Sequence, residues 1–156
     1  MDHSQAGQDA TNVQRAAWMR VLSLADPAAL DGAFSALNGL PAHQMLRPPQ
    51  TGMAMVRARS GGTGARFNLG EMTVTRCAVT MDSGVVGIAY VQGRSQRHAE
   101  QAAVADALLQ LPDWHETVHA QLIHPLARQH AARVERQAQV AAQTKVEFFT
   151  MVRGED

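Results

Sequence analysis

The chain of 156 residues is long enough to bury a core as one domain, and 46% apolar residues with only 4% aromatic indicate a core of Ala, Val, Leu and Met. A formal net charge of zero removes any global attraction to nucleic acid or to a membrane surface, so a charge argument has to be local. The lone Cys77 excludes an intramolecular disulfide, and without a signal peptide or a long apolar segment we expect a cytoplasmic protein.

The first 40 residues predict two helices. Residues 1–10 are polar and have no period, so we expect a flexible tail. A helix then follows over residues 11–24, with Thr11 or Asn12 as its N-cap and Trp18 in the core or against a partner. Its residues at helical spacing are Val13, Ala16, Ala17, Arg20, Val21 and Leu24. A second helix starts at Asp26-Pro27, with Asp as N-cap, and ends at Gly39, which completes a helical hairpin.

The middle of the chain predicts an antiparallel sheet. Pro41 and Pro48-Pro49 forbid regular structure before it. Residues 53–59 alternate, which fits a half-buried strand with Ala54, Val56 and Ala58 on one face and Met53, Met55, Arg57 and Arg59 on the other. A glycine loop at 60–64 leads to a second strand at 72–81, and an Asp-Ser-Gly turn leads to a third at 85–91.

The last third predicts helices. Gly93-Arg94-Ser95 opens one that runs to Pro112, and another begins near Asp113, with a kink or break expected at His124 because Pro125 follows. Residues 126–143 hold few large apolar side chains, so this helix is expected on the surface or against another subunit. Residues 146–152 have the composition of a final strand that could join the sheet.

These elements predict an α+β fold: an antiparallel β-sheet of three to four strands, packed with an N-terminal helical hairpin and C-terminal helices. One domain is expected to span residues 1–156.

The stretch from Leu46 to Cys77 is the first place where we expect an anion. Arg47 to Arg97 contains seven Arg against two acids, and a guanidinium suits bidentate binding of phosphate or carboxylate. The loop at 60–64 could present backbone N–H groups to such an anion, although it is not a P-loop because no Gly-Lys-Ser/Thr follows. The alternative is an ordinary mobile turn between two strands.

The helix start after Gly93 is a second anion hypothesis. A helix N-terminus offers free backbone donors at its positive end, and Arg94, Ser95 and His98 would lie around it. His98 could hold a phosphate or act in acid–base chemistry, and a solvated first turn is the alternative. Glu100 lies two residues further on and would not face it.

The letters His115-Glu116-Thr117-Val118-His119 match the HExxH pattern of zinc peptidases, in which two His hold the metal and Glu activates its water. A third ligand at metzincin spacing does not follow, since the next His is His124 just before Pro125. With seven His in the chain an accidental match is expected, so we disfavour a metal at His115, Glu116 and His119.

Four ordered motifs together resemble one family. They are RAAWMRVLSLA, TGMAMVRARSGGTGARFNLGEMTVTRC, GIAYVQGRSQRHAEQAAVADALLQ and VEFFTMVRG, and the match runs nearly the whole chain, from Arg15 to Gly154. The sequence is similar to PhnG, a small subunit of the bacterial carbon–phosphorus lyase core complex that breaks down phosphonates. Gln50 stands where Glu is common in that family, and Ser95 where Asp is common, so chemistry that needs an acid at either position would be missing here.

The resemblance implies partners and a reaction. The partners are PhnH, PhnI and PhnJ, with the ATPase-like PhnL. The reaction gives ribose 1-methylphosphonate 5-triphosphate and adenine from ATP and an alkylphosphonate, with the nucleosidase chemistry on PhnI and an essential, non-catalytic role for PhnG. ATP and the alkylphosphonate would be substrates of the complex, and no cofactor is expected on this subunit alone. Two alternatives stay open: a purely structural subunit and an HExxH zinc hydrolase.

The candidates for ligand or interface binding come from the anion hypotheses and the resemblance. A phosphorylated small molecule is a candidate ligand, whereas nucleic acid and membrane are not expected. The residues are Arg47, Thr51, Arg57, Arg59, Gly61, Gly62, Thr63, Gly64, Arg76, Arg94, His98 and Glu100.

Overall fold

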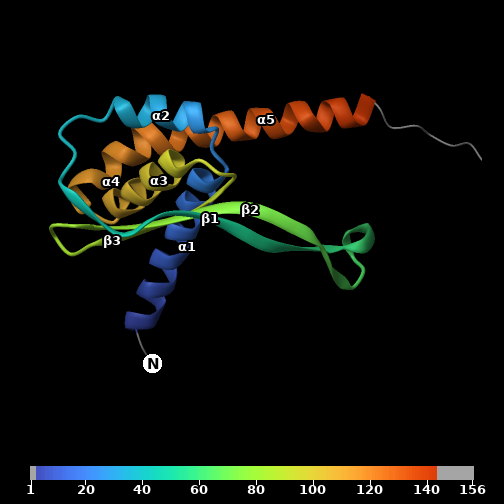
Figure 1. Cartoon of the computed structure of the whole chain (residues 1–156), viewed down its shortest axis with the longest axis horizontal. Coiled ribbons are helices and arrows are strands. Elements are labelled where there is room, and N and C mark those ends of the chain that lie inside the picture. The colour runs from blue at the N-terminus through green and yellow to red at the C-terminus, as the bar shows by residue number, and fades with distance from the viewer. Residues whose placement is uncertain (1–2, 144–156) are drawn as a thin grey trace, which may run out of the picture.

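A computed structural model describes residues 3–143 and confirms the predicted α+β fold (Figure 1). Three strands form one antiparallel sheet in the order β1-β2-β3. The predicted strand at 146–152 lies outside the described residues. None of the described helices is long and apolar enough to cross a membrane. The elements are α1 His3–Leu24, α2 Pro27–Ser35, β1 His43–Arg59, a 3₁₀ turn Ser60–Gly62, β2 Arg66–Met81, β3 Val86–Gln92, α3 Gln96–Leu109, α4 Pro112–Val118, a π-helical turn His119–Ile123 and α5 His124–Gln143.

Helix α1 corrects two predictions. It begins at His3, so neither an irregular segment up to residue 10 nor a cap at Thr11 or Asn12 is correct; the Gln- and Ala-rich segment simply continues the helix. Its buried face is also different from the predicted one. Trp18 and Leu22 lie in the core, as expected for Trp18, whereas Val13 is 70% exposed. Trp18 and Leu22 have large apolar side chains four residues apart, so they determine which face of α1 turns toward the core.

Helix α2 follows its sequence signals closely. The Asp26 carboxylate accepts a hydrogen bond from Ala29 N at 3.0 Å, and Pro27 occupies the first turn, as predicted. The helix ends at Ser35, and Gly39 adopts a positive φ of 69° just beyond it.

Strand β1 runs through Pro48 and Pro49, so the prediction that these residues forbid regular structure is wrong. β1 is an edge strand, and its register against β2 shifts between Arg47 and Gln50, which places one extra residue on β1 at the prolines. At a bulge of an edge strand, a proline removes no hydrogen bond that the sheet needs. The predicted alternation further along is confirmed, since Ala54, Val56 and Ala58 are half-buried and their neighbours are exposed.

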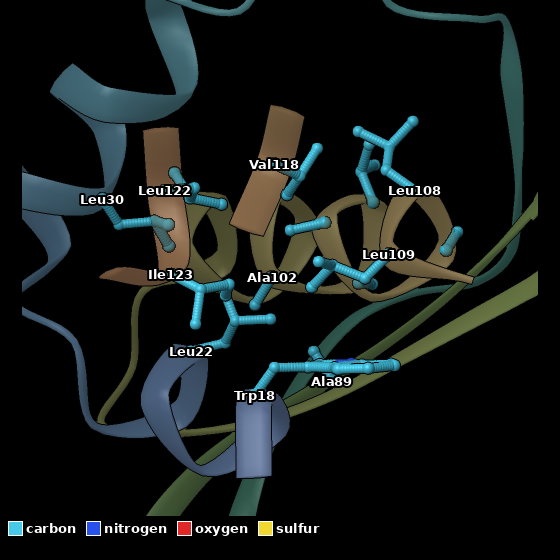
Figure 2. Packing of buried hydrophobic residues seen from close by; sticks show 14 of the residues in the cluster. Trp18, Leu22, Leu30, Ala89, Ala102, Leu108, Leu109, Val118, Leu122 and Ile123 are labelled. Atoms are coloured by element: carbon cyan, nitrogen blue, oxygen red, sulfur yellow. The ribbon is translucent and has the colours of Figure 1, made fainter. Parts of the chain in front are cut away.

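The core lies between the sheet and α3, and α1, α2 and α4 close it (Figure 2). Almost every residue of α3 from His98 to Leu109 is buried, and many are alanines, so the helix lies close to the strands. At Gly87 on β3, an added Cβ atom would lie 2.0 Å from the carbonyl oxygen of Ala103. Small residues on both sides therefore fix the spacing between α3 and the sheet.

The predicted irregularity near Pro125 takes the form of a π-helical turn. The chain stays helical from Pro112 to Gln143, and the N–H of His124 bonds to the carbonyl of His119. Pro125 has no N–H to continue the α-helical pattern, which accounts for a wider turn just before it. Only Leu126 of α5 is buried, which confirms a surface helix, and Figure 1 shows α5 extending beyond the body of the protein.

Candidate functional site

The face of the sheet turned away from α3 carries a hollow of about 910 Å³, bordered by all three strands and the end of α1. Gln50, Arg76 and Tyr90 form one row across its floor, because Arg76 pairs with Gln50 on one side and with Tyr90 on the other. The next row is Gly52, Val74 and Gln92. Gly52 has no side chain, which leaves room between the first row and Ala54.

The described side chains that line this hollow are largely apolar, and Arg76 is the one cation among them. The guanidinium of Arg76 is exposed and donates to Gln50 Oε1 at 3.2 Å, while the Tyr90 ring is about half exposed. Met72 and Val74 supply apolar floor beside them. Such a surface can bind an apolar group that carries a carboxylate or another acceptor, since the exposed guanidinium of Arg76 has more donors than its one bond to Gln50 uses.

Thr51, a predicted binding residue, has a structural contact. Its hydroxyl lies 3.0 Å from the hydroxyl of Thr75, which is fully buried and donates to the carbonyl of Gly93 at 2.8 Å. Gly93, with a φ of 98°, in turn donates its N–H to the carbonyl of Thr73. These hydrogen bonds stabilise the turn that connects the end of β3 to the start of α3.

The glycine loop lies at the far end of β1 and β2, and two of its backbone donors form hydrogen bonds within the turn. The N–H groups of Thr63 and Gly64 both bond to the carbonyl of Ser60, and Arg59 donates to the carbonyl of Gly64 at 3.0 Å. Gly61 and Gly62 adopt positive φ values of 59° and 82°, which the tight turn requires. These contacts favour the turn interpretation over an anion nest.

Helix α3 starts after Gly93-Arg94-Ser95 as predicted, but His98 lies in the core and not in an accessible first turn. Ser95 accepts a hydrogen bond from His98 N at 3.1 Å. Only 2% of His98 is exposed, and its Nε2 lies 2.7 Å from the carbonyl oxygen of Leu22. Burial lowers the pKa of His98 below its ordinary value of 6.5. His98 is therefore a neutral side chain that ties α3 to α1.

The remaining candidates divide between surface and interior. Arg47, Arg57 and Arg94 are exposed, whereas Glu100 is half-buried on the face of α3 toward Cys77. Burial, followed by the Glu100 charge, raises the pKa of the Cys77 thiol, which keeps it protonated and unreactive.

The HExxH residues lie on α4 and the π-helical turn. His115 and His119 stack with ring centroids 5.7 Å apart, and the His124 ring meets His119 edge-on at 4.7 Å. His115 Nδ1 lies 2.6 Å from the carbonyl of Leu109, so the ring is held against the end of α3. Within residues 3–143, no group of three or more His, Cys, Asp or Glu side chains is placed to hold a metal ion.

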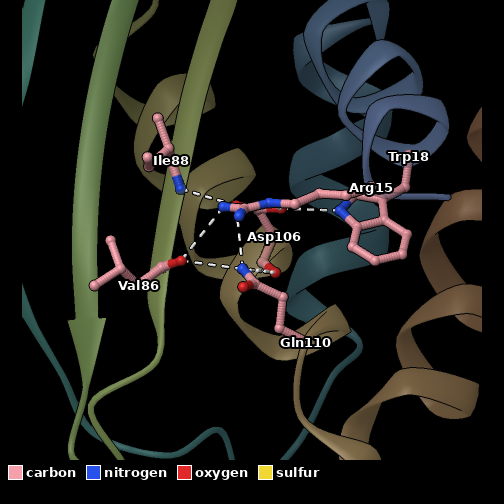
Figure 3. A network of polar contacts seen from close by, with 6 residues as sticks. All are labelled: Arg15, Trp18, Val86, Ile88, Asp106 and Gln110. Atoms are coloured by element: carbon pink, nitrogen blue, oxygen red, sulfur yellow. Dashed lines mark hydrogen bonds and ion pairs between the residues drawn. The ribbon is translucent and has the colours of Figure 1, made fainter. Parts of the chain in front are cut away.

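Asp106 is a central residue that the sequence reasoning missed. It is fully buried on α3 and accepts bonds from Arg15 at 2.7 and 3.1 Å, from Trp18 Nε1 at 2.9 Å and from Ile88 N at 2.9 Å (Figure 3). It therefore joins α1, β3 and α3. An acid inside the apolar run AAVADALL is the signal that could have identified it.

The described chain is thus a small α+β protein whose sheet exposes apolar side chains and arginines on its open face. The comparisons with known proteins are specific. Residues 13–154 match the family described as "Phosphonate metabolism protein PhnG". The chain is also 40% identical over 160 residues to the "Alpha-D-ribose 1-methylphosphonate 5-triphosphate synthase subunit PhnG" of Rhizobium meliloti (strain 1021), with 100% of this chain and 99% of that protein covered. The chain belongs to the PhnG family, which confirms the resemblance.

Proposed function

We propose that this chain is a subunit of a cytoplasmic alpha-D-ribose 1-methylphosphonate 5-triphosphate synthase that acts in phosphonate catabolism. The observation that carries the proposal is the end-to-end similarity to the Rhizobium meliloti subunit, at 40% identity. In this reaction an oxygen of the alkylphosphonate bonds to ribose C1 of ATP, the bond from C1 to adenine breaks, and adenine leaves with a proton.

The contribution of this subunit is to bind other subunits and to complete the assembly. The exposed sheet face supports this role, because its apolar residues and guanidiniums suit contact with a protein surface. The position of His98 supports it as well, since this titratable candidate is held in the core, away from the hollow. The proposed partners are PhnH, PhnI and PhnJ, together with PhnL.

The test is reconstitution with and without this chain. The chain is co-expressed with PhnH, PhnI, PhnJ and PhnL, and the release of adenine from ATP is measured with and without methylphosphonate. We expect a stoichiometric complex whose adenine release requires both methylphosphonate and this chain. Failure to co-purify, or full activity without the chain, would overturn the proposal.

A second comparison separates a purely structural role from contact with a phosphorylated ligand. Arg47 and Arg94 are exposed at opposite ends of the chain segment that forms the sheet. If they meet partner surfaces, Arg47→Ala and Arg94→Ala weaken co-purification. If they contact substrate, the complex forms normally and adenine release falls.

A further inference from the structure

The outer halves of β1 and β2 form a two-stranded ribbon that leaves the body of the protein (Figure 1). β3 pairs with β2 only from Val74 to Thr80, so residues 66–72 of β2 and residues 53–59 of β1 have no third strand beside them. We call these two segments the ribbon. An isolated two-stranded ribbon is at best marginally stable in water, which indicates that something else packs on it.

The ribbon exposes large apolar side chains. Met53 is 69% exposed, Leu69 64%, Met55 52% and Phe67 45%. Scattered apolar residues are ordinary on a protein surface. The register places Met53 and Met55 on the same face as Arg57 and Arg59, whereas Phe67, which is paired with Ala58, lies on the other face. Two exposed methionines beside guanidiniums are the kind of surface that marks an interaction site. Methionine and phenylalanine are also enriched where proteins meet.

The charge of the ribbon indicates what its partner carries. Arg57, Arg59 and Arg66 lie on it against Glu71, although the whole chain has no net charge. Arg59 and Arg66 are directly opposite each other across the two strands, and like charges in that position are destabilising. Carboxylates on a partner would relieve this repulsion. A second copy of the chain would bring the same positive charge against itself.

The free edge of the sheet lies on the same side of the molecule as the ribbon's β1 strand. On the opposite edge, Ile88 N of β3 donates to Asp106, and Val86 O accepts from Gln110 Nε2 at 3.0 Å (Figure 3). In the first half of β1, Pro48 and Pro49 have no N–H groups with which another strand could pair. The part of β1 beyond the prolines therefore remains open to a neighbouring chain.

We propose that the ribbon is a docking arm that lies on an apolar surface bordered by carboxylates on another subunit of the synthase. This proposal rests on the proposed function, and it identifies the ribbon as the main surface by which this subunit contacts the other subunits. Met53 and Met55 pack on the apolar part, and the guanidiniums of Arg57, Arg59 and Arg66 on the same face pair with the carboxylates, which fixes the orientation of the arm.

The experiment compares matched single substitutions in the co-expressed complex with PhnH, PhnI and PhnJ. Met53→Ser is paired with Val13→Ser on α1, because the two side chains are 69% and 70% exposed. Arg57→Glu is paired with Arg20→Glu, an exposed position on α1. Circular dichroism and thermal unfolding of each free subunit check that the fold is kept. Titration of the free subunit into the complex that lacks it gives the dissociation constants.

We expect each ribbon variant to bind about tenfold or more weakly, as interface anchors commonly do, while the α1 variants stay within about twofold of wild type. Raising the salt concentration should weaken wild-type binding more than binding of Arg57→Glu.

The outcomes separate the two proposals. If the wild-type chain does not assemble, the proposed function fails. If it assembles and the ribbon variants bind as tightly as the α1 variants, the proposed function stands and the docking arm is overturned. If Arg57→Glu assembles normally but loses adenine release, the cation serves a phosphorylated ligand, and the docking arm is again overturned.

Discussion

Asp106 is the residue on which the attachment of α1 depends. Its carboxylate is fully buried and accepts from Arg15, Trp18 and Ile88, so Asp106→Ala leaves a guanidinium and two N–H groups without their acceptor. We expect a loss of about 3–5 kcal/mol in the free energy of unfolding, measured by urea denaturation. Glu135→Ala, on the exposed side of α5, is the control and should change it by less than about 0.5 kcal/mol. A loss below about 1 kcal/mol for Asp106→Ala would contradict this account.

His98 makes a prediction about pH. Its Nε2 must carry a proton to donate to Leu22, and its buried Nδ1 has no hydrogen-bond partner among the described residues, so a second proton is unfavourable. Because the folded pKa lies below 6.5, the ring stabilises the fold fully above pH 6.5. That contribution is lost as the pH falls toward the folded pKa, by at most about 1.4 kcal/mol per pH unit.

The His98 prediction is measured by NMR titration of its ring and by unfolding at several pH values. We expect a titration midpoint below 6.5, and a smaller drop in stability between pH 7 and 5 for His98→Asn than for wild type. Burial and the neighbouring His124 and His115 also lower the pKa of His119, so some drop will remain in the variant. A His98 midpoint at or above 6.5 would show that the ring is not held as described.

At the scale of elements, Gly87 sets the distance between α3 and the sheet. Gly87→Ala would place a methyl group 2.0 Å from the Ala103 carbonyl, so α3 would have to move, at a cost of about 1–3 kcal/mol or more. Gly32→Ala is the matched control, since nothing lies within 4 Å of the added methyl group in α2. There the substitution should stabilise by about 0.5–1 kcal/mol. Thermal unfolding of both variants measures the contrast, and equal midpoints would refute it.

The elements that the sequence predicts well are those with local signals. Asp26 caps α2 as predicted, because an N-cap bond joins residues three apart. The elements predicted wrongly depend on distant contacts. Pro48 and Pro49 fit inside β1 because β1 is an edge strand with a bulge, and neither property can be deduced from the dipeptide. The face of α1 likewise depends on where Trp18 meets Asp106, 88 residues away.

At the scale of the whole molecule, topology decides which candidate residues lie together. The glycine loop at 60–64 and the helix start at Gly93-Arg94 are the two places where the sequence predicts an anion. Gly93 donates its N–H to the carbonyl of Thr73, whereas the loop joins β2 at Arg66. Thr73 and Arg66 are roughly 20 Å apart along β2, at about 3.3 Å per residue. Sequence reasoning could find the cations but not the length of the ribbon that separates them.

The arrangement of a compact body with two extensions predicts a gradient of local stability in the free subunit. α3 is buried along most of its length, while the ribbon and α5 bury few side chains. Amide hydrogen exchange should therefore be slowest in α3 and in the part of β2 paired with β3, and fastest in the ribbon and along α5. In the assembled synthase, protection should rise at residues 53–59 and 66–72 and stay the same at Val13 and its neighbours on α1. Ribbon amides that exchange as slowly in the free subunit as those of α3 would mean that the ribbon is stable alone, and the structural reason for a partner there would disappear.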